Sequence, residues 1–298
     1  MKRVRLIALA VILIISTLIV GSFLIKPHDP LSPTEKIGVC MHLADFNLQT
    51  ESAMIDLGVR WVRIDWIIGE MGPFMERMAA DRIAVLAIID HNTMNQLNFT
   101  LQDWQSNVSA ILASDEAKLV SAWEIWNEPN NPSFYIGYMD GSAEHYFDML
   151  KIAYTTIKAT SNAPVVSAGL SPNGNWETWL NTLQDLGSKN YSDVQGIHLY
   201  YDLVSTNLEK VNSIKAYGQP VWITEIGRPS STGNYSPEEQ ATYLADNLDL
   251  LAPNVEKVFW YELKDNVGLT PPKENFFGLI TTEYTPKPSY DAFTSLLK

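Results

Sequence analysis

Cysteine is nearly absent from this 298-residue chain, in which Cys40 is the single one. One cysteine cannot form an intramolecular disulfide, and metal sites that need several cysteines are excluded. We expect Cys40 to pack within a strand, with a nucleophilic thiol as the alternative. Basic residues are also few, since 21 lysines and arginines face 34 aspartates and glutamates and leave a formal net charge of −13. Without a basic stripe to displace counterions, the chain should not bind nucleic acid.

Charged residues are missing from the apolar run of residues 6–25, which follows Lys2, Arg3 and Arg5. At a rise of ~1.5 Å per residue, a helix of this length matches the ~30 Å hydrocarbon core of a bilayer. The basic flank should stay in the cytoplasm and direct the rest of the chain outward. We therefore expect residues 1–26 to be a signal anchor, a transmembrane helix that holds the protein on the extracellular face of the cell membrane. A cleaved signal peptide, which would give a secreted protein, is the alternative.

Residues 27–36 contain three prolines and predict a short, stiff linker. Beyond it, residues 37–298 alternate apolar, strand-like runs with amphipathic, helix-like stretches, a pattern typical of βα units around a parallel sheet. We expect eight strands, at residues 37–42, 61–66, 83–90, 121–127, 164–169, 194–200, 220–225 and 257–262. Eight parallel strands close into a (β/α)8 or TIM barrel. The chain is therefore predicted to be a monomer of class α/β with one barrel domain.

Two of these strand-like runs end on a glutamate that is followed by turn residues. Glu128 follows Trp-Glu-Ile-Trp-Asn, and Glu225 follows Val-Trp-Ile-Thr. Barrel enzymes hold their catalytic residues at the C-terminal ends of the strands. One carboxyl group that gives a proton and a second that attacks are the groups needed to cleave a glycosidic bond. For Glu225 the alternative is a helix cap or a surface charge, because most glutamates in proteins lie on the surface.

Strand alternation gives a first assignment of faces. Residues two apart share a face, so Glu124, Trp126 and Glu128 should project together, while Asn127 projects the other way. At a strand end the backbone is already turning, so Asn127 and Glu128 can both reach the mouth of the barrel, although alternation does not show it. Glu124 lies deeper in the barrel than Glu128, and a buried carboxylate needs a partner. We expect Glu124 to be structural, with Arg63 of the second strand as its candidate partner.

Three motifs in this chain resemble the hallmarks of retaining glycoside hydrolases of clan A. They are Trp-Asn-Glu-Pro at 126–129, Thr-Glu-Ile-Gly at 224–227 and His-Leu-Tyr at 198–200. Residues 58–63, 277–279 and 287–290 are most similar to members of families 39 and 5. The resemblance covers residues 37–298. It implies a (β/α)8 barrel that cleaves a β-linked glycan or glycoside by double displacement.

The resemblance also implies roles for individual residues. Glu128 becomes the acid/base and Glu225 the nucleophile, whose negative charge should raise the pKa of Glu128. The remaining implied contacts are Asn127 with the sugar 2-hydroxyl, Arg63 and Tyr200 with the nucleophile, and Trp260 as the floor of the subsite for the reacting sugar. For Arg63 a structural ion pair inside the barrel is the alternative.

Further side chains are candidates for substrate binding. His198 and His42, each near a strand end, either hydrogen-bond sugar hydroxyls or are core histidines. Trp176 either stacks on a sugar in an outer subsite or packs in the core. No His-x-x-x-His or cysteine spacing is present, so we predict that no metal or other cofactor takes part in the chemistry.

Two other functions are compatible with the same residues. A barrel anchored in the membrane could bind an oligo- or polysaccharide without cleaving it. A transglycosylase that remodels surface polysaccharide would use the same covalent intermediate and exclude water. Barrels that have lost their activity usually lack one of the two carboxylates. This chain has both, which favours an enzyme over a binding protein.

Overall fold

The computed structural model describes residues 33–94, 99–134, 141–172, 175–200, 202–231, 235–269 and 271–298. The predicted anchor, residues 1–26, and most of the predicted linker lie outside these residues. Among the helices described, none combines the length and the apolar character needed to cross a membrane. Residues 31–298 form one compact unit.

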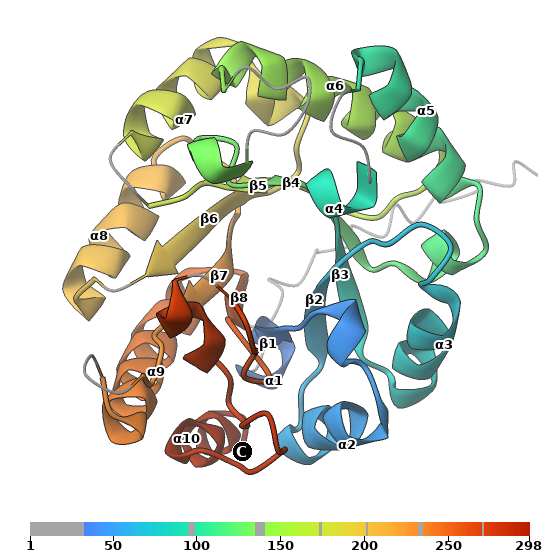
Figure 1. The fold of residues 1–298 in the computed structure, drawn as a ribbon. Coiled ribbons are helices and arrows are strands. Elements are labelled where there is room, and N and C mark those ends of the chain that lie inside the picture. The colour runs from blue at the N-terminus through green and yellow to red at the C-terminus, as the bar shows by residue number, and fades with distance from the viewer. Residues whose placement is uncertain are drawn as a thin grey trace, which may run out of the picture. The chain divides into compact units, whose positions relative to one another are not determined.

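Eight parallel strands surround a central axis in this unit (Figure 1). They are β1 (Ile37–Cys40), β2 (Trp61–Asp65), β3 (Ala84–Ile89), β4 (Ala122–Asn127), β5 (Val165–Gly169), β6 (Gln195–Tyr200), β7 (Val221–Gly227) and β8 (Lys257–Trp260). The hydrogen-bonded order is β5-β4-β3-β2-β1-β8-β7-β6. Two parallel bridges, Val166 with Val194 and Leu170 with Ile197, join β5 to β6 and close the barrel. All eight predicted strands are confirmed, with boundaries within two residues of the prediction.

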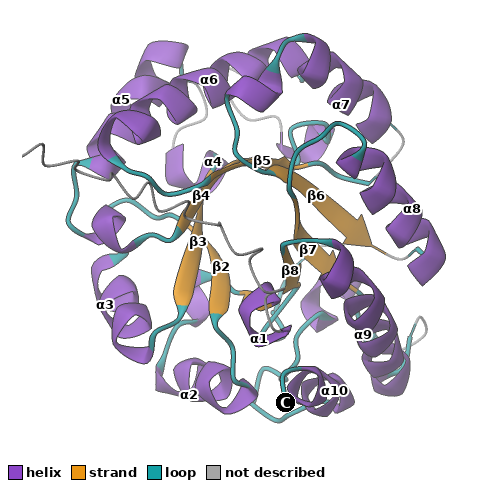
Figure 2. Ribbon diagram, turned by 180° about the vertical axis from the view of Figure 1, so that it is seen from behind, coloured by secondary structure: helices purple, strands orange, loops and turns teal. Residues whose placement is uncertain are grey.

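Helices form a ring outside the strands (Figure 2). The long ones are α2 (Leu48–Leu57), α3 (Gly72–Asp81), α5 (Leu101–Leu112), α6 (Ala143–Thr160), α7 (Trp176–Asp185), α8 (Val204–Lys215), α9 (Pro237–Leu251) and α10 (Pro288–Leu296). Helix α9 begins as its sequence predicts, because the Ser236 side chain accepts a hydrogen bond from the backbone N–H of Glu239, and Pro237 takes the first position. The short helices are α1 (Pro33–Lys36) and α4 (His91–Met94).

Helix α1 falls within residues predicted as linker. The Lys36 ammonium group donates hydrogen bonds to the carbonyl oxygens of Ala252 and Val255, both at 3.0 Å. These contacts join the last residues of the predicted linker to the segment that precedes β8.

The apolar core has two layers. The larger lies between the sheet and the helices, and the smaller is made of strand residues that fill the inside of the barrel, namely Cys40, Leu86, Ala122, Val166, Val194, Trp222 and Phe259. The Cys40 thiol lies 3.4 Å from the carbonyl oxygen of Thr224, and burial raises its pKa. A thiol that holds its proton is a poor nucleophile, so Cys40 is a packing residue as predicted.

Candidate active site

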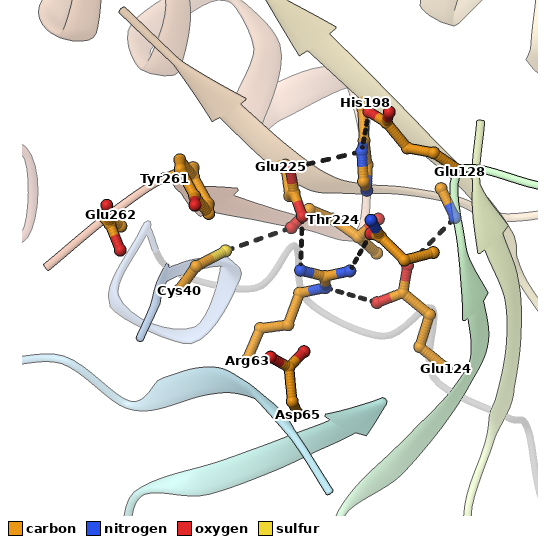
Figure 3. A network of polar contacts seen from close by, with 12 residues as sticks. Cys40, Arg63, Asp65, Glu124, Glu128, His198, Thr224, Glu225, Tyr261 and Glu262 are labelled. Atoms are coloured by element: carbon orange, nitrogen blue, oxygen red, sulfur yellow. Dashed lines mark hydrogen bonds and ion pairs between the residues drawn. The ribbon is translucent and has the colours of Figure 1, made fainter. Parts of the chain in front are cut away.

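A cavity of about 460 Å³ opens at the C-terminal ends of the strands. Its volume lies within the range of small-molecule sites. Among the lining residues are both predicted carboxylates and the polar side chains expected beside them: Arg63, Asn127, Glu128, Tyr200 and Glu225. Figure 3 shows three of these side chains converging: Arg63 of β2, Glu128, which follows β4, and Glu225 of β7.

Arg63 and Tyr200 hold the Glu225 carboxylate. Arg63 Nη1 lies 2.6 Å from Glu225 Oε1, and the Tyr200 hydroxyl donates a hydrogen bond to Glu225 Oε2. Arg63 is only 5% exposed and Glu225 only 8%. Burial disfavours the guanidinium charge, but the nearby carboxylates outweigh it and raise the pKa of Arg63 well above its ordinary value. The predicted contacts of both side chains with Glu225 are therefore present.

Glu124 is fully buried and fully paired. Arg63 Nε lies 2.5 Å from Glu124 Oε2, and the backbone N–H of Gly169 donates to Glu124 Oε1 at 3.0 Å. The guanidinium also donates to Asn127 Oδ1 at 3.1 Å. Arg63 thus forms the structural ion pair and the nucleophile contact at once, and the two alternatives for this residue are both realised.

The end of β4 does not follow simple alternation. Trp126 has φ +72° and Glu128 has φ +43°, both in the left-handed region that few side chains adopt. The indole of Trp126 packs against Phe99 and Trp104, on the helix side of the sheet. Simple alternation is therefore wrong for Trp126, and the turn of the backbone at the strand end brings Asn127 and Glu128 together to the cavity, which is the alternative that the sequence left open.

A second irregularity lies in β7. Ile197 pairs with Ile223, but His198, the next residue of β6, pairs with Glu225. One extra residue on β7, Thr224, has no counterpart, as in a β-bulge. Ile223 packs in the core between sheet and helices, whereas Glu225 lines the cavity. Alternation alone would have put Ile223 and Glu225 on the same face.

His198 stands between the two glutamates. Its Nδ1 lies 2.9 Å from Glu128 Oε1 and 3.3 Å from Glu225 Oε2, and the side chain is fully buried. One oxygen from each glutamate and this nitrogen all lie within 4.8 Å of one another. Asn131 also donates to Glu128 Oε2, at 2.8 Å. The predicted catalytic pair is therefore brought face to face, and His198 is part of the site.

The charges of this trio favour a proton on the imidazole. Burial opposes the charged form of His198, but the negative charge of Glu225 and the hydrogen bond with Glu128 raise its pKa above the ordinary value. For Glu128, burial raises the pKa, but contacts with His198, Asn131 and Ser171 outweigh it and lower the pKa. The expectation of a raised pKa for Glu128 is wrong for the unliganded site, because the contacts with His198, Asn131 and Ser171 outweigh burial and lower it.

The same trio is the set of side chains whose spacing would suit a metal ion, among the residues that the structure describes. Arg63 and Tyr200 already bind Glu225 on its other sides. A cation beside Arg63 would meet electrostatic repulsion. We therefore assign the trio to proton and sugar chemistry, and the absence of a metal requirement stays a prediction.

A second polar group lines the opposite wall of the cavity, at the ends of β1, β2 and β8. His42 Nδ1 lies 3.6 Å from Asp65 Oδ2, and its Nε2 lies 3.3 Å from Glu262 Oε2 and 3.4 Å from the Tyr261 hydroxyl. Burial lowers the pKa of His42, but Asp65 and Glu262 outweigh it and raise the pKa well above its usual range. His42 lines the cavity and is partly exposed there, but both of its ring nitrogens already have polar partners in the protein.

Neither predicted tryptophan lies at the cavity. Trp260 is fully buried and packs near Tyr243 of α9, and Trp176 is 8% exposed in the core between sheet and helices. On β8, Phe259 faces into the barrel, so Trp260 faces the helices and Tyr261 faces inward again. All nine tryptophans lie in the described part of the chain, and none lines the cavity. Its aromatic walls are Phe134, Tyr200, Tyr261 and Phe277.

Several cavity residues were not predicted. Asp65 follows Arg63 by two positions on β2, so alternation alone could have found it. Tyr261 could have been found in the same way from Phe259. Asn131 lies in the loop after β4, and Glu274 lies in a short 3-10 helix, Pro272–Phe276, after β8. Neither segment has a strand periodicity that would indicate which side chains face the cavity.

Known proteins resemble this chain in sequence and in fold. The family described as glycosyl hydrolase catalytic core matches residues 90–278. A β-xylosidase of Caldicellulosiruptor saccharolyticus is 28% identical over an alignment of 204 residues, and the match covers 59% of this chain and 41% of that protein. The chain therefore matches less than half the length of this curated relative.

Solved structures share the fold at low identity. A family 39 glycoside hydrolase from the gut symbiont Bacteroides cellulosilyticus WH2 has a TM-score of 0.66 at 21% identity, covering 90% of this chain and 64% of that one. A monomeric β-xylosidase from Caulobacter crescentus CB15 has a TM-score of 0.71 at 16% identity, covering 90% of this chain and 68% of that one. At these identities the likeness shows a common barrel.

Proposed function

The chain belongs to the glycosyl hydrolase catalytic core family, and from this premise we propose that it cleaves a β-linked glycoside with retention of anomeric configuration. The resemblance of its motifs to clan A glycoside hydrolases is confirmed by the family match, which spans both catalytic glutamates. In this proposal Glu225 is the nucleophile and Glu128 is the acid/base.

The spacing of the two carboxylates carries the proposal. One oxygen of Glu128 and one of Glu225 lie within 4.8 Å of each other. Retaining enzymes place the two groups ~5–5.5 Å apart, whereas inverting enzymes need roughly 6.5–9.5 Å to admit a water molecule between sugar and base. The short separation favours direct attack by Glu225 on the sugar.

The surroundings suit Glu225 to attack. Arg63 and Tyr200 each hold one of its two oxygens by a hydrogen bond and so fix the orientation of the carboxylate. In the first step a Glu225 oxygen bonds to the anomeric carbon, and the bond to the leaving oxygen breaks while that oxygen takes a proton from Glu128. This yields a glycosyl-enzyme ester and an alcohol.

His198 and Glu128 together hold the proton that this step needs. His198 Nδ1 lies 2.9 Å from Glu128 Oε1, and the raised pKa of His198 favours a proton on the imidazole in the unliganded site. A bound sugar displaces water and disfavours the separated charges, so the proton moves to Glu128 and leaves a neutral pair. In the second step Glu128, now ionised, takes a proton from water as the water attacks the ester. Free Glu225 and the retained sugar are released, and the proton returns to His198.

The substrate class follows from the cavity walls and from the relatives. The cavity is lined by carboxylates, histidines and amides, which hydrogen-bond sugar hydroxyls, and by four aromatic side chains that can contact sugar faces. Two relatives are named β-xylosidases. We therefore propose an oligo- or polysaccharide substrate, with a β-xyloside as the first to be tried.

A panel of aryl β-glycosides and polysaccharides tests the proposal. The wild-type chain should release the aryl alcohol from at least one of them, and Glu225→Gln should reduce turnover to background while its circular dichroism spectrum stays unchanged. Binding of a glycan without turnover by the wild-type chain would instead support the non-catalytic barrel. Transglycosylation would appear as longer products when an acceptor sugar is added.

We also propose that the domain is monomeric and is held outside the cell by residues 1–26. The support is the uninterrupted apolar run after a basic flank. Membrane fractionation combined with protease treatment of intact cells tests it. The expected result is a membrane-bound chain whose barrel is accessible to the protease.

A further inference from the structure

The aromatic side chains that line the cavity fall into two groups. Tyr200, Tyr261 and Phe277 contact one another edge-on, with ring centroids 5.5–6.2 Å apart. Tyr200 also donates a hydrogen bond to Glu225, so this group borders the proposed nucleophile. Phe134 packs instead against His91, with centroids 5.6 Å apart. Aromatic rings therefore line the cavity at two separate places.

Hydrogen bonds fix the position of Phe134 relative to Glu128. The backbone N–H of Asn131 donates to the Glu128 carbonyl oxygen at 2.9 Å, and that of Phe134 donates to the Asn131 carbonyl oxygen at 3.0 Å. The Asn131 side chain donates to Glu128 Oε2 at 2.8 Å and accepts from the backbone N–H of Ser133 at 3.1 Å. A 3-10 turn, Pro132–Phe134, ends at the phenyl ring. The segment that carries the proposed acid/base therefore also places this ring in the cavity wall.

The loop after β5 completes the same wall. Asn130 Nδ2 donates to the Ser171 carbonyl oxygen at 2.9 Å, and Asn130 Oδ1 accepts from the backbone N–H of Ser171 at 2.8 Å. The Ser171 side chain in turn hydrogen-bonds Glu128. Ser171, Pro172 and Phe134 all line the cavity. The loops after β4 and β5 thus form one wall beside the proposed acid/base.

The chemistry of the first step determines which part of the substrate lies along this wall. Glu128 gives its proton to the glycosidic oxygen, so it must lie within hydrogen-bond reach of that atom. The leaving group is attached through the same oxygen and therefore extends along the wall on the Glu128 side. The reacting sugar, whose anomeric carbon Glu225 attacks, lies beside the other aromatic group. A ring in the leaving group would then meet Phe134.

We propose that Phe134 is a specificity-determining residue, whose ring is the platform of a leaving-group subsite for a sugar or an aryl ring. This inference rests on the proposed function and deepens it. Phe134 is half-buried, so part of its ring is open to contact. His91, which packs against it, also packs near the buried Trp126, with centroids 6.3 Å apart. Sugar rings have apolar C–H faces that pack on such a supported aromatic plane, and a leaving group without a ring gains nothing from it.

A glycosyl fluoride provides the sharpest test, because fluoride leaves without placing a ring in the subsite. The measurement is kcat/KM of the wild type and of Phe134→Ala, in the full chain, for the phenyl β-glycoside and the β-glycosyl fluoride of the same sugar. On the phenyl glycoside the variant should lose about 10- to 100-fold, the range expected when a large apolar contact is removed. On the fluoride the two proteins should be equal. Equal losses on both substrates, or no loss on either, would overturn the proposal.

Two further variants serve as controls. Phe134→Tyr keeps the ring and should keep the wild-type ratio between the two substrates. Phe147→Ala removes a half-buried ring of α6 that packs against Tyr191 at the same centroid distance, 5.6 Å, and it should leave both rates unchanged. A loss selective for the phenyl glycoside in Phe147→Ala would contradict a local role of Phe134.

A second measurement needs no variant. Methyl and phenyl β-thioglycosides carry sulfur in place of the glycosidic oxygen and resist cleavage, so they act as inhibitors. The phenyl compound should inhibit the wild type at least about tenfold more strongly, and equal inhibition constants would contradict the platform. A wild-type chain that cleaved neither fluorides nor aryl glycosides would refute the proposed function. Normal cleavage with an unchanged substrate ratio in Phe134→Ala would refute the subsite alone.

Discussion

Arg63 Nη1 lies 2.6 Å from Glu225 Oε1, and the same guanidinium extends its Nε to Glu124. One planar group thus ties Glu225, the proposed nucleophile, to a carboxylate deep inside the barrel. The fork geometry of arginine allows this double contact, and a lysine ammonium group cannot reproduce it.

Replacing Arg63 by lysine should therefore displace Glu225 while keeping the positive charge. We expect kcat/KM to fall about 100-fold, the loss typical of a small displacement at a reacting group. The free energy of unfolding should fall by about 1–3 kcal/mol, because a buried acceptor loses its partner. Steady-state kinetics and urea unfolding measure the two effects. Arg77→Lys, at an ion pair with Glu51 whose arginine is half exposed, is the matched control and should leave kcat/KM unchanged.

Glu128→Gln should separate substrates by their leaving groups. A glutamine cannot donate a proton, so glycosides with poor leaving groups should lose a factor of about 10²–10⁴ in kcat/KM. Glycosides with activated leaving groups need little acid assistance, and their loss should be far smaller. A series of aryl glycosides with graded leaving groups provides the measurement. Equal losses across the series would show that residue 128 is not the acid.

Gly169→Ala should damage the site although the residue touches no substrate. The added methyl group would lie 2.1 Å from His198 Nε2, so the imidazole could not keep its present position beside both glutamates. Overpacking of a core costs about 1–3 kcal/mol, so we expect a lower Tm together with a clear loss of kcat. Gly72→Ala offers the control, because its methyl group would meet only the flexible side chain of Glu116, at 3.3 Å. Unchanged kcat in Gly169→Ala would contradict the placement of His198.

The His42 cluster should make stability depend on pH. Folding raises the pKa of His42, because Asp65 and Glu262 outweigh burial. A group of this kind contributes stability that is complete below its unfolded pKa of about 6.5 and is lost as the pH rises through the folded pKa. Tm should therefore fall as the pH increases above about 6.5, and His42→Gln should flatten that slope. Parallel slopes for the two proteins would show that His42 is not charged in the fold.

The strands could be predicted from sequence because parallel strands in a barrel are buried on both faces. Each reads as a continuous apolar run between turn signals. The two catalytic glutamates could be found for the same reason, since a carboxylate at the end of such a run must lie at the rim of the barrel. The family resemblance added the contacts of Arg63 and Tyr200 with Glu225.

Side-chain directions at the strand ends could not be predicted. The left-handed residue Trp126 and the extra residue Thr224 leave no mark in hydrophobic periodicity, yet they decide what faces the cavity. At Trp260, by contrast, strand alternation does predict the observed side-chain direction. Alternation along β8 places its indole on the helix side, and the assignment failed because it followed the resemblance and not the pattern. The effect of His198 on Glu128 depends on a 2.9 Å contact between β6 and β4, which no sequence pattern encodes.

The stereochemistry of the first product tests the central claim most directly. Proton NMR during hydrolysis of an aryl β-glycoside that the chain accepts shows which anomer of the free sugar is released before mutarotation. A nucleophilic Glu225 facing Glu128 at this separation predicts the β-anomer first, with the α-anomer growing in slowly afterwards. Initial release of the α-anomer would mean that water attacks directly, and would contradict the assignment of Glu225 as the nucleophile.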